Sequence, residues 1–208
     1  MAARAMWKAD LALGEIKVPV KLYAAVRDTK VHFRLLHAAD HAPVKQQMVD
    51  PETEEPVASE QLEKAVALDR GVYVLLTEEE QAALAPKPSR LISVEQVVAS
   101  SAVDERWFDR PYYLGPDGDD EGYFALAEAL KKREAIGIAH WVLRNKRYVG
   151  ALQASGGYLL LDTLRYAQEI VEVSAVKPSA NRAPDKREIA LAEQLIGALE
   201  DHFDPSEF

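Results

Sequence analysis

The chain has 208 residues, of which 48% are hydrophobic and 28% charged, a balance typical of a soluble globular protein with a sizeable core. It contains no cysteine, which excludes disulfides and thiolate metal sites, and no apolar run long enough to cross a bilayer. The sequence does not open on a signal-peptide pattern, so we expect a cytoplasmic protein.

The formal net charge of −9 argues against a nucleic-acid-binding protein, because such proteins usually carry a basic surplus. The charges are segregated, however. Basic side chains outnumber acidic ones between residues 4 and 37, whereas acidic residues gather at 50–80, 104–128 and 185–207. Since local potential decides where a polyanion binds, an acidic protein with a basic lining is physically coherent.

Two predicted strands, residues 16–23 and 30–35, alternate between apolar and basic side chains. The apolar positions are Ile16, Val18, Val20 and Leu22 in the first strand and Val31, Phe33 and Leu35 in the second. The opposite positions carry Lys17, Lys21, Lys30, His32 and Arg34. Side chains two residues apart lie roughly 6.6 Å apart on a strand, a spacing that can follow a phosphate backbone. Periodicity alone favours the alternative that these residues form the solvated face of a half-buried sheet.

The middle of the chain mixes strands and short helices. In order we predict a polar strand at 44–49, an exposed turn at 50–56, a strand at 72–76, a helix capped by Thr77, a strand at 91–98 and a helix at about 121–134. Trp107, Phe108, Tyr112 and Tyr113 lie beside Arg106 and Arg110. Such a cluster can stack on bases, but aromatic core packing is the commoner arrangement, and we favour it.

The last third of the chain predicts a β-meander. Three strands at 136–143, 148–152 and 158–164 are joined by short turns, and several antiparallel strands in succession indicate a barrel. Residues 177–184 form a linker, and a helix with an apolar stripe begins at Asp185. The fold class is therefore α+β, with an antiparallel β-barrel core at 1–176 and a linker with a C-terminal helical arm at 177–208.

No catalytic constellation stands out. His37, Asp40 and His41 are the best metal-binding candidates, but further ligands at a telling distance do not follow, and a turn explains them better. The acidic turn at 115–120 lacks the alternating ligands and closing Glu of a calcium loop, so we interpret it as a helix N-cap. We therefore expect neither a cofactor nor a metal.

Several motifs, in order, resemble the prokaryotic Ku family, the DNA-end-binding proteins of non-homologous end joining. They are the tryptophan and L-x-L-G near the start, IKVPVKLY at 16–23, FRLLH at 33–37, GVYVLLTEEE at 71–80, RPYYLGP at 110–116 and GYLLLDTLRY at 157–166. The resemblance covers most of residues 7–172. It implies bridge- and pillar-type excursions from the barrel and a bacterial, nucleoid-associated protein without enzymatic activity.

The resemblance also implies a homodimeric ring that holds double-stranded DNA ends without reading sequence and recruits an ATP-dependent DNA ligase, often of the ligase D type. From the basic positions above, the matching bridge region and the basic hairpin tip we assign the DNA-binding set to Lys17, Lys21, Lys30, Arg34, Lys45, Gln47, Arg90, Arg144, Lys146 and Arg147. The hairpin tip at 144–147 can equally be solvated. Ku proteins commonly continue beyond the position of Phe208 into more helix and often a lysine-rich tail, so we expect these 208 residues to dimerise and bind DNA but to stimulate a ligase only weakly.

Two other functions remain open from the sequence. One is an acidic protein-interaction module on a barrel scaffold, whose basic strand face meets an acidic protein. The other is a hydrolase with a carboxylate site in the turn at 117–121.

Overall fold

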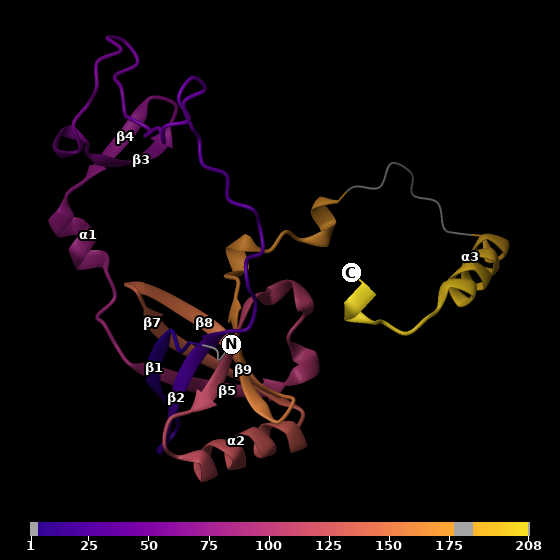
Figure 1. Ribbon diagram of the computed structural model, residues 1–208. Coiled ribbons are helices and arrows are strands. Elements are labelled where there is room, and N and C mark those ends of the chain that lie inside the picture. Colours follow the sequence, from indigo (N-terminus) through magenta and orange to yellow (C-terminus); the bar gives the residue numbers. More distant parts are fainter. Residues whose placement is uncertain (1–3, 177–184, 208) are drawn as a thin grey trace. The chain divides into compact units, whose positions relative to one another are not determined.

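Strands far apart in the sequence close into a β-barrel in the order β1-β2-β6-β9-β8-β7-β5 (Figure 1). The computed structural model describes residues 4–176 and 185–207, which fall into two compact units, Met1–Ile170 and Val171–Phe208. The barrel strands are β1 (Trp7–Leu13), β2 (Ile16–Ala24), β5 (Leu91–Ala99), β6 (Phe108–Pro116), β7 (Ala135–Leu143), β8 (Lys146–Ser155) and β9 (Tyr158–Leu164). Neighbouring strands are antiparallel except β1 and β5, whose parallel pairing closes the barrel. The predicted barrel and meander are confirmed.

The remaining regular elements are a separate hairpin and a few helices. The hairpin consists of β3 (Lys64–Asp69) and β4 (Val72–Leu76), and the α-helices are α1 (Glu78–Leu84), α2 (Asp120–Lys132) and α3 (Lys186–Leu199). Single 3₁₀ turns occur at Ser59–Gln61, Ser100–Ala102, Glu105–Trp107, Ala167–Glu169, Val173–Ala175 and Pro205–Glu207. In the described part of the chain no helix is long and apolar enough to span a membrane.

The helix caps follow the predicted chemistry. The Thr77 hydroxyl accepts from the Glu80 amide at the start of α1, and the Glu80 carboxylate accepts from the Thr77 amide. Asp119 caps α2 in the same way, because its carboxylate accepts from the Gly122 amide at 2.9 Å. The acidic turn therefore begins a helix, as the sequence predicted.

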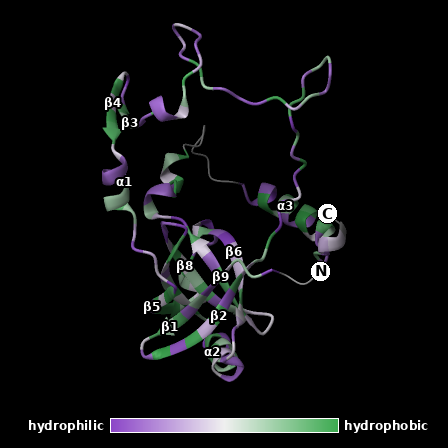
Figure 2. Ribbon diagram, turned by 60° about the vertical axis from the view of Figure 1, so that its left-hand side comes forward, coloured by the Kyte–Doolittle hydropathy of each residue, from purple (hydrophilic) through white to green (hydrophobic). Residues whose placement is uncertain are grey.

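The barrel interior is filled by one side of each strand. Val18, Val20 and Leu22 of β2 are each 1% exposed, which confirms the predicted alternation, visible as bands along β2 in Figure 2. Ile16 at the β1–β2 turn is 58% exposed, because the strand begins there. Helix α2 packs on the barrel and buries Tyr123, whose hydroxyl donates to the Leu114 carbonyl and accepts from the Leu159 amide (Figure 1).

Residues 25–90, inserted between β2 and β5, form what we call the excursion. The predicted strand at 30–35 is wrong: these residues have no strand conformation, and Val31, Phe33 and Leu35 are 74%, 89% and 70% exposed. The predicted strand at 44–49 is also wrong, because that stretch makes only one isolated bridge, between Val49 and Pro56. A strand needs a neighbour that satisfies its backbone groups along its length, and the described residues give these stretches only single hydrogen bonds, such as that from the Val44 amide to the Leu35 carbonyl.

The turns predicted within the excursion are present. The His37 ring lies 2.9 Å from the Asp40 carboxylate, which also accepts from the Ala42 amide, so these residues form a turn. The Asp50 carboxylate accepts from the Glu52 amide at 2.8 Å at the start of the exposed turn at 50–56. Both carboxylates thus organise local backbone.

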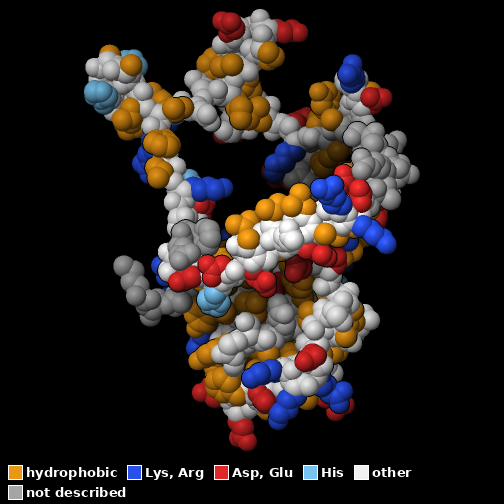
Figure 3. Space-filling model, turned by 90° about the vertical axis from the view of Figure 1, so that its right-hand side faces the viewer, with side chains coloured by type: hydrophobic (Ala, Val, Ile, Leu, Met, Phe, Trp, Pro, Cys, Tyr) orange, Lys and Arg blue, Asp and Glu red, His pale blue; other side chains and the backbone are white. Residues whose placement is uncertain are grey.

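The second unit carries the predicted helix, α3, which begins at Lys186 with Asp185 as its N-cap. The predicted linker at 177–184 lies outside the described residues. Figure 3 shows hydrophobic side chains gathered along the exposed surface of α3. They belong to Ile189, Leu191, Leu195, Ile196 and Leu199.

Candidate nucleic-acid interface

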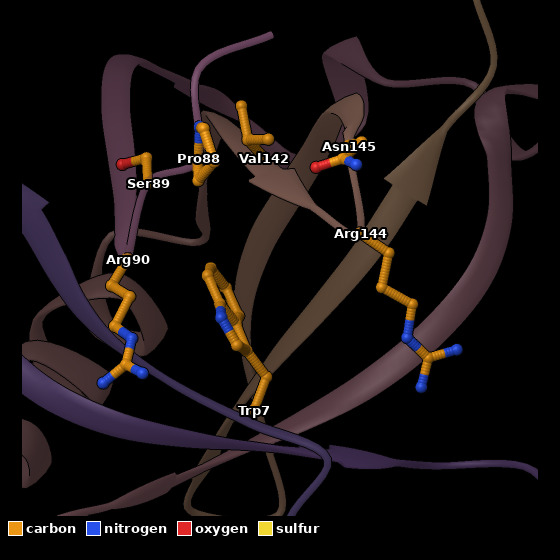
Figure 4. A pocket seen from close by; sticks show the side chains of 7 residues that line it. All are labelled: Trp7, Pro88, Ser89, Arg90, Val142, Arg144 and Asn145. Atoms are coloured by element: carbon orange, nitrogen blue, oxygen red, sulfur yellow. The ribbon is translucent and has the colours of Figure 1, made fainter. Parts of the chain in front are cut away.

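A hollow of about 370 Å³ opens where the barrel wall is incomplete. Its lining residues, which define what we call the basic hollow, are Trp7, Pro88, Ser89, Arg90, Val142, Arg144 and Asn145 (Figure 4). Strand β1 pairs with β5 only from Asp10 onward, and β7 runs past its last β5 partner, His140. The start of β1 and the end of β7 are therefore left without β5 between them, and the hollow forms in that gap.

Trp7 lies at the centre of the basic hollow. Figure 4 shows its ring between Arg90 and Arg144, which belong to different segments of the chain and lie on opposite sides of the ring. Trp7 is half-buried and packs against the barrel core, and the odd-numbered residues that follow it, Ala9 and Leu11, are buried. Because side chains alternate along a strand, Trp7 faces inward like Ala9 and Leu11, and it is the first residue of β1.

Backbone geometry fixes both arginines. The Arg90 carbonyl accepts from the Asp10 amide at 2.8 Å, which anchors the entry into β5 against β1. Arg144 and Asn145 form the two-residue turn between β7 and β8, with φ of 50° and 60°. Positive φ at both positions matches the twist of a tight hairpin, but it is an uncommon conformation for arginine.

The basic side chains around the hollow are electrostatically uncompensated. Among the described residues, Arg90, Arg144, Lys146 and Arg147 have no carboxylate oxygen within 4.0 Å. Arg147 lines an adjoining hollow of about 170 Å³ that shares Ser89 and Val142 with the first. Arg90, Arg144 and Arg147 thus border one continuous surface, and Lys146 belongs to the same hairpin. Such clusters attract phosphates, which bind arginine in a bidentate manner.

Lys21, by contrast, is already paired. On the outer side of the barrel it lies directly opposite Lys8 in the β1–β2 register, and Asp117 bridges the two. The carboxylate of Asp117 is 2.6 Å from the Lys21 ammonium and 2.9 Å from that of Lys8. Hydrogen bonds from Lys21 and then Lys8 lower the pKa of Asp117, and the bond to Asp117 raises the pKa of Lys21. Asp117 thereby offsets the repulsion between two like charges.

The remaining predicted residues are dispersed. Lys17 is exposed near the β1–β2 turn, while Lys30, Arg34, Lys45 and Gln47 lie exposed in the excursion. The expectation that Lys30 and Arg34 share a sheet face with Lys17 and Lys21 is wrong, because residues 30–35 form no strand. The structure therefore groups only the basic residues at 90 and 144–147.

Two carboxylates of the acidic turn already have partners. Asp117 is committed to two lysines and Asp119 to the N-cap of α2. Over the residues that the structure describes, no group of three or more His, Asp or Glu side chains could hold a metal ion. Asp117 and Asp119 are therefore not free to act as the carboxylate site of the hydrolase that the sequence left open.

Sequence reasoning missed the uncharged residues of the basic hollow: Trp7, Pro88, Ser89, Val142 and Asn145. Trp7 could have pointed to the site, because it is a large aromatic residue at the start of a strand, where the barrel interior meets solvent. Its proximity to Arg144 depends on strand pairing across more than a hundred residues, which local periodicity does not report.

The fold and the basic hollow together define a β-barrel protein with a surface suited to polyanions. Comparison with known proteins then identifies the family. The Ku70/Ku80 beta-barrel domain matches residues 12–191, and the chain belongs to the Ku family.

Three relatives illustrate the similarity. The chain is 38% identical over 208 residues to non-homologous end joining protein Ku 2 of Geotalea uraniireducens, covering 100% of this chain and 81% of the relative. It is 35% identical over 213 residues to the Ku protein of Coxiella burnetii, with coverage of 100% and 78%. For Bacillus subtilis Ku the identity is 30% over 207 residues, with coverage of 98% and 66%.

Proposed function

We propose that this chain binds the ends of double-stranded DNA in non-homologous end joining. It holds the duplex without reading its sequence, acts as a homodimer that encloses the DNA, and recruits an ATP-dependent DNA ligase rather than catalysing a reaction itself. The observation that carries the proposal is membership of the Ku family across residues 12–191, since the relatives are named non-homologous end joining proteins.

Phosphate contacts supply the affinity in this proposal. Arg90, Arg144, Lys146 and Arg147 are exposed and lack carboxylate partners within the described residues, so neutralising phosphates does not require breaking an ion pair. Contacts of this kind release counterions and carry no sequence information. The net charge of −9 disfavours DNA at acidic parts of the surface and restricts binding to such basic clusters.

The excursion supports the homodimer. Figure 2 shows hydrophobic residues along the β3–β4 hairpin, and Tyr73 and Leu75 of β4 are mostly exposed. A two-stranded hairpin is marginally stable alone, and exposed apolar clusters of this extent mark interaction sites. A second copy of the chain would cover these residues and supply the strand partner that residues 30–35 lack.

The ligase requires a protein-binding surface. The apolar stripe of α3, exposed in the described second unit, is the surface that we assign to it. An amphipathic helix of this kind inserts its apolar face into a groove on a partner.

The test is a competition between linear and closed circular DNA of one sequence, read by gel shift on a short linear duplex without divalent metal. A ring must be threaded from an end, so the linear competitor should displace the probe at much lower concentration than the circle. Equal competition would contradict the ring. Absence of binding to either DNA would favour the protein-interaction module instead.

A further inference from the structure

We propose that the basic hollow binds one unpaired nucleotide at a DNA end, with the base against Trp7 and its phosphate held by Arg144, one of the two arginines that flank the ring. The inference rests on the proposed function and extends it, because a ring on duplex phosphates needs no aromatic residue in a recess. The chemical unit recognised is a nucleoside monophosphate.

The composition of the hollow points to this ligand. Two arginines supply the donors that phosphate prefers, and an indole ring between them supplies a stacking surface. The Ser89 hydroxyl and the Asn145 amide, which both donate and accept, can bond a base edge. A phosphate ion alone has no flat apolar face that could stack on an indole ring, so the aromatic side chain indicates a ligand that also carries a base.

The size and position of the hollow restrict the nucleotide to an unpaired one. Its volume of about 370 Å³ is at the small end of ligand sites, which suits a single nucleotide. A base inside a duplex is covered on both faces by its neighbours, so a recessed indole ring cannot stack on it. An overhanging or frayed base has a free face and leaves the stack more readily than a paired base inside the duplex.

The backbone at Arg144 is a second observation in favour of a ligand. Arg144 and Asn145 hold φ of 50° and 60°, and asparagine tolerates this conformation far better than arginine. Glycine or asparagine at position 144 would form the same turn with less strain. Residues kept in strained conformations cluster at binding sites, and Arg144 brings its guanidinium group to the edge of the hollow.

The first experiment tests the hollow without duplex. The full chain is titrated with dAMP, deoxyadenosine and inorganic phosphate while Trp fluorescence is recorded, and the signal of a Trp7→Phe variant is subtracted. We expect dAMP to bind more tightly than either fragment, and Arg144→Ala to weaken dAMP at least tenfold. Binding of phosphate as tight as that of dAMP, or no Trp7-dependent signal at saturating dAMP, would overturn the proposal.

The second experiment asks whether the nucleotide comes from a DNA end. Affinities are measured for a blunt duplex and for the same duplex with a single-nucleotide overhang, and the readout is their ratio, which cancels any loss of folded protein. We expect the wild type to favour the overhang severalfold and Trp7→Leu, which keeps an apolar side chain, to lose this preference. Lys146→Ala is the matched control, since it removes a neighbouring charge outside the hollow and should lower both affinities while preserving the ratio.

The two proposals can fail separately. Wild-type binding of both duplexes with a ratio of one would overturn the nucleotide site and leave end binding intact. If neither duplex binds, the proposed function fails, and tight dAMP binding in the first experiment would still support a nucleotide site, for free nucleotides rather than DNA ends.

Discussion

At the scale of single residues, ion pairing decides which cations remain available to phosphate. Lys21 is neutralised by Asp117, whereas Arg90 has no carboxylate partner among the described residues. The sequence predicted that both residues bind DNA, because the alternating pattern around Lys21 does not show that the fold brings Asp117 next to it.

The first prediction compares these two cations. Arg90→Ala should flatten the slope of log affinity against log salt by about 0.9, the loss of one phosphate contact. Lys21→Ala should change the slope by less, because Lys21 is paired with Asp117 and therefore contributes no full phosphate contact that the substitution could remove. Affinities for one linear duplex measured at several salt concentrations provide the slopes. Equal flattening by the two substitutions would show that Lys21 leaves Asp117 to contact DNA.

A second residue-scale prediction concerns Asp162, whose side chain is 6% exposed in β9. Burial raises its pKa, and the hydrogen bond from the Gln153 amide at 2.8 Å offsets this in part. The unfolded chain therefore ionises first, so the wild type loses stability as pH rises from about 3.8 through the raised pKa of the folded state. Asp162→Asn should be more stable than wild type at pH 7, and the two should converge below pH 3.8 in urea titrations. A constant difference at all pH values would contradict burial as the cause.

At the scale of elements, we expect Arg144 in the β7–β8 turn to lower the stability of the fold while it strengthens DNA binding. Replacing Arg144 by Gly removes a non-glycine residue from positive φ and should stabilise the fold by about 1 kcal/mol. The same change should weaken DNA binding, because it removes one uncompensated charge. Urea denaturation and gel-shift titration of Arg144→Gly measure the two effects, and Lys146→Ala, outside the two-residue turn, should weaken binding without the gain in stability. If Arg144→Gly is less stable than wild type, the turn is not strained.

Elements were predictable from the sequence where their partners are local. The meander from β7 to β9 and the Thr77 cap depend on residues a few positions apart, so periodicity and turn chemistry locate them. Residues 30–35 alternate between apolar and polar side chains just as clearly, yet they form no strand. Alternation shows that a segment could pair and bury one face, but it does not show that a neighbouring strand exists in the same chain. The basic hollow was out of reach for a related reason: its arginines were predicted, but their convergence on Trp7 depends on barrel closure between β1 and β5.

At the scale of the whole molecule, exposed apolar residues and segregated charge are both consistent with the homodimer around DNA proposed above. Phe33 is 89% exposed, so its replacement removes almost no contact within one chain. A Phe33→Asp variant should fold as well as the wild type but dimerise weakly in sedimentation experiments. Ile16→Asp is the matched control, since Ile16 is an exposed apolar residue of the barrel outside the excursion and should leave the dimer intact.

The proposed homodimer predicts how the protein is held on DNA. Protein loaded on a linear fragment that is then ligated into a circle has no end from which to leave, so wild type should remain bound through a salt wash that breaks phosphate contacts. The Phe33→Asp variant, which cannot close a ring, should wash off linear and circular DNA alike, whereas Ile16→Asp should be retained. Cutting the circle before the wash should release the wild type, which separates topological linkage from tight binding. Retention of the Phe33→Asp variant, or release of the wild type from intact circles, would mean that the protein holds DNA by an open surface and not by enclosure.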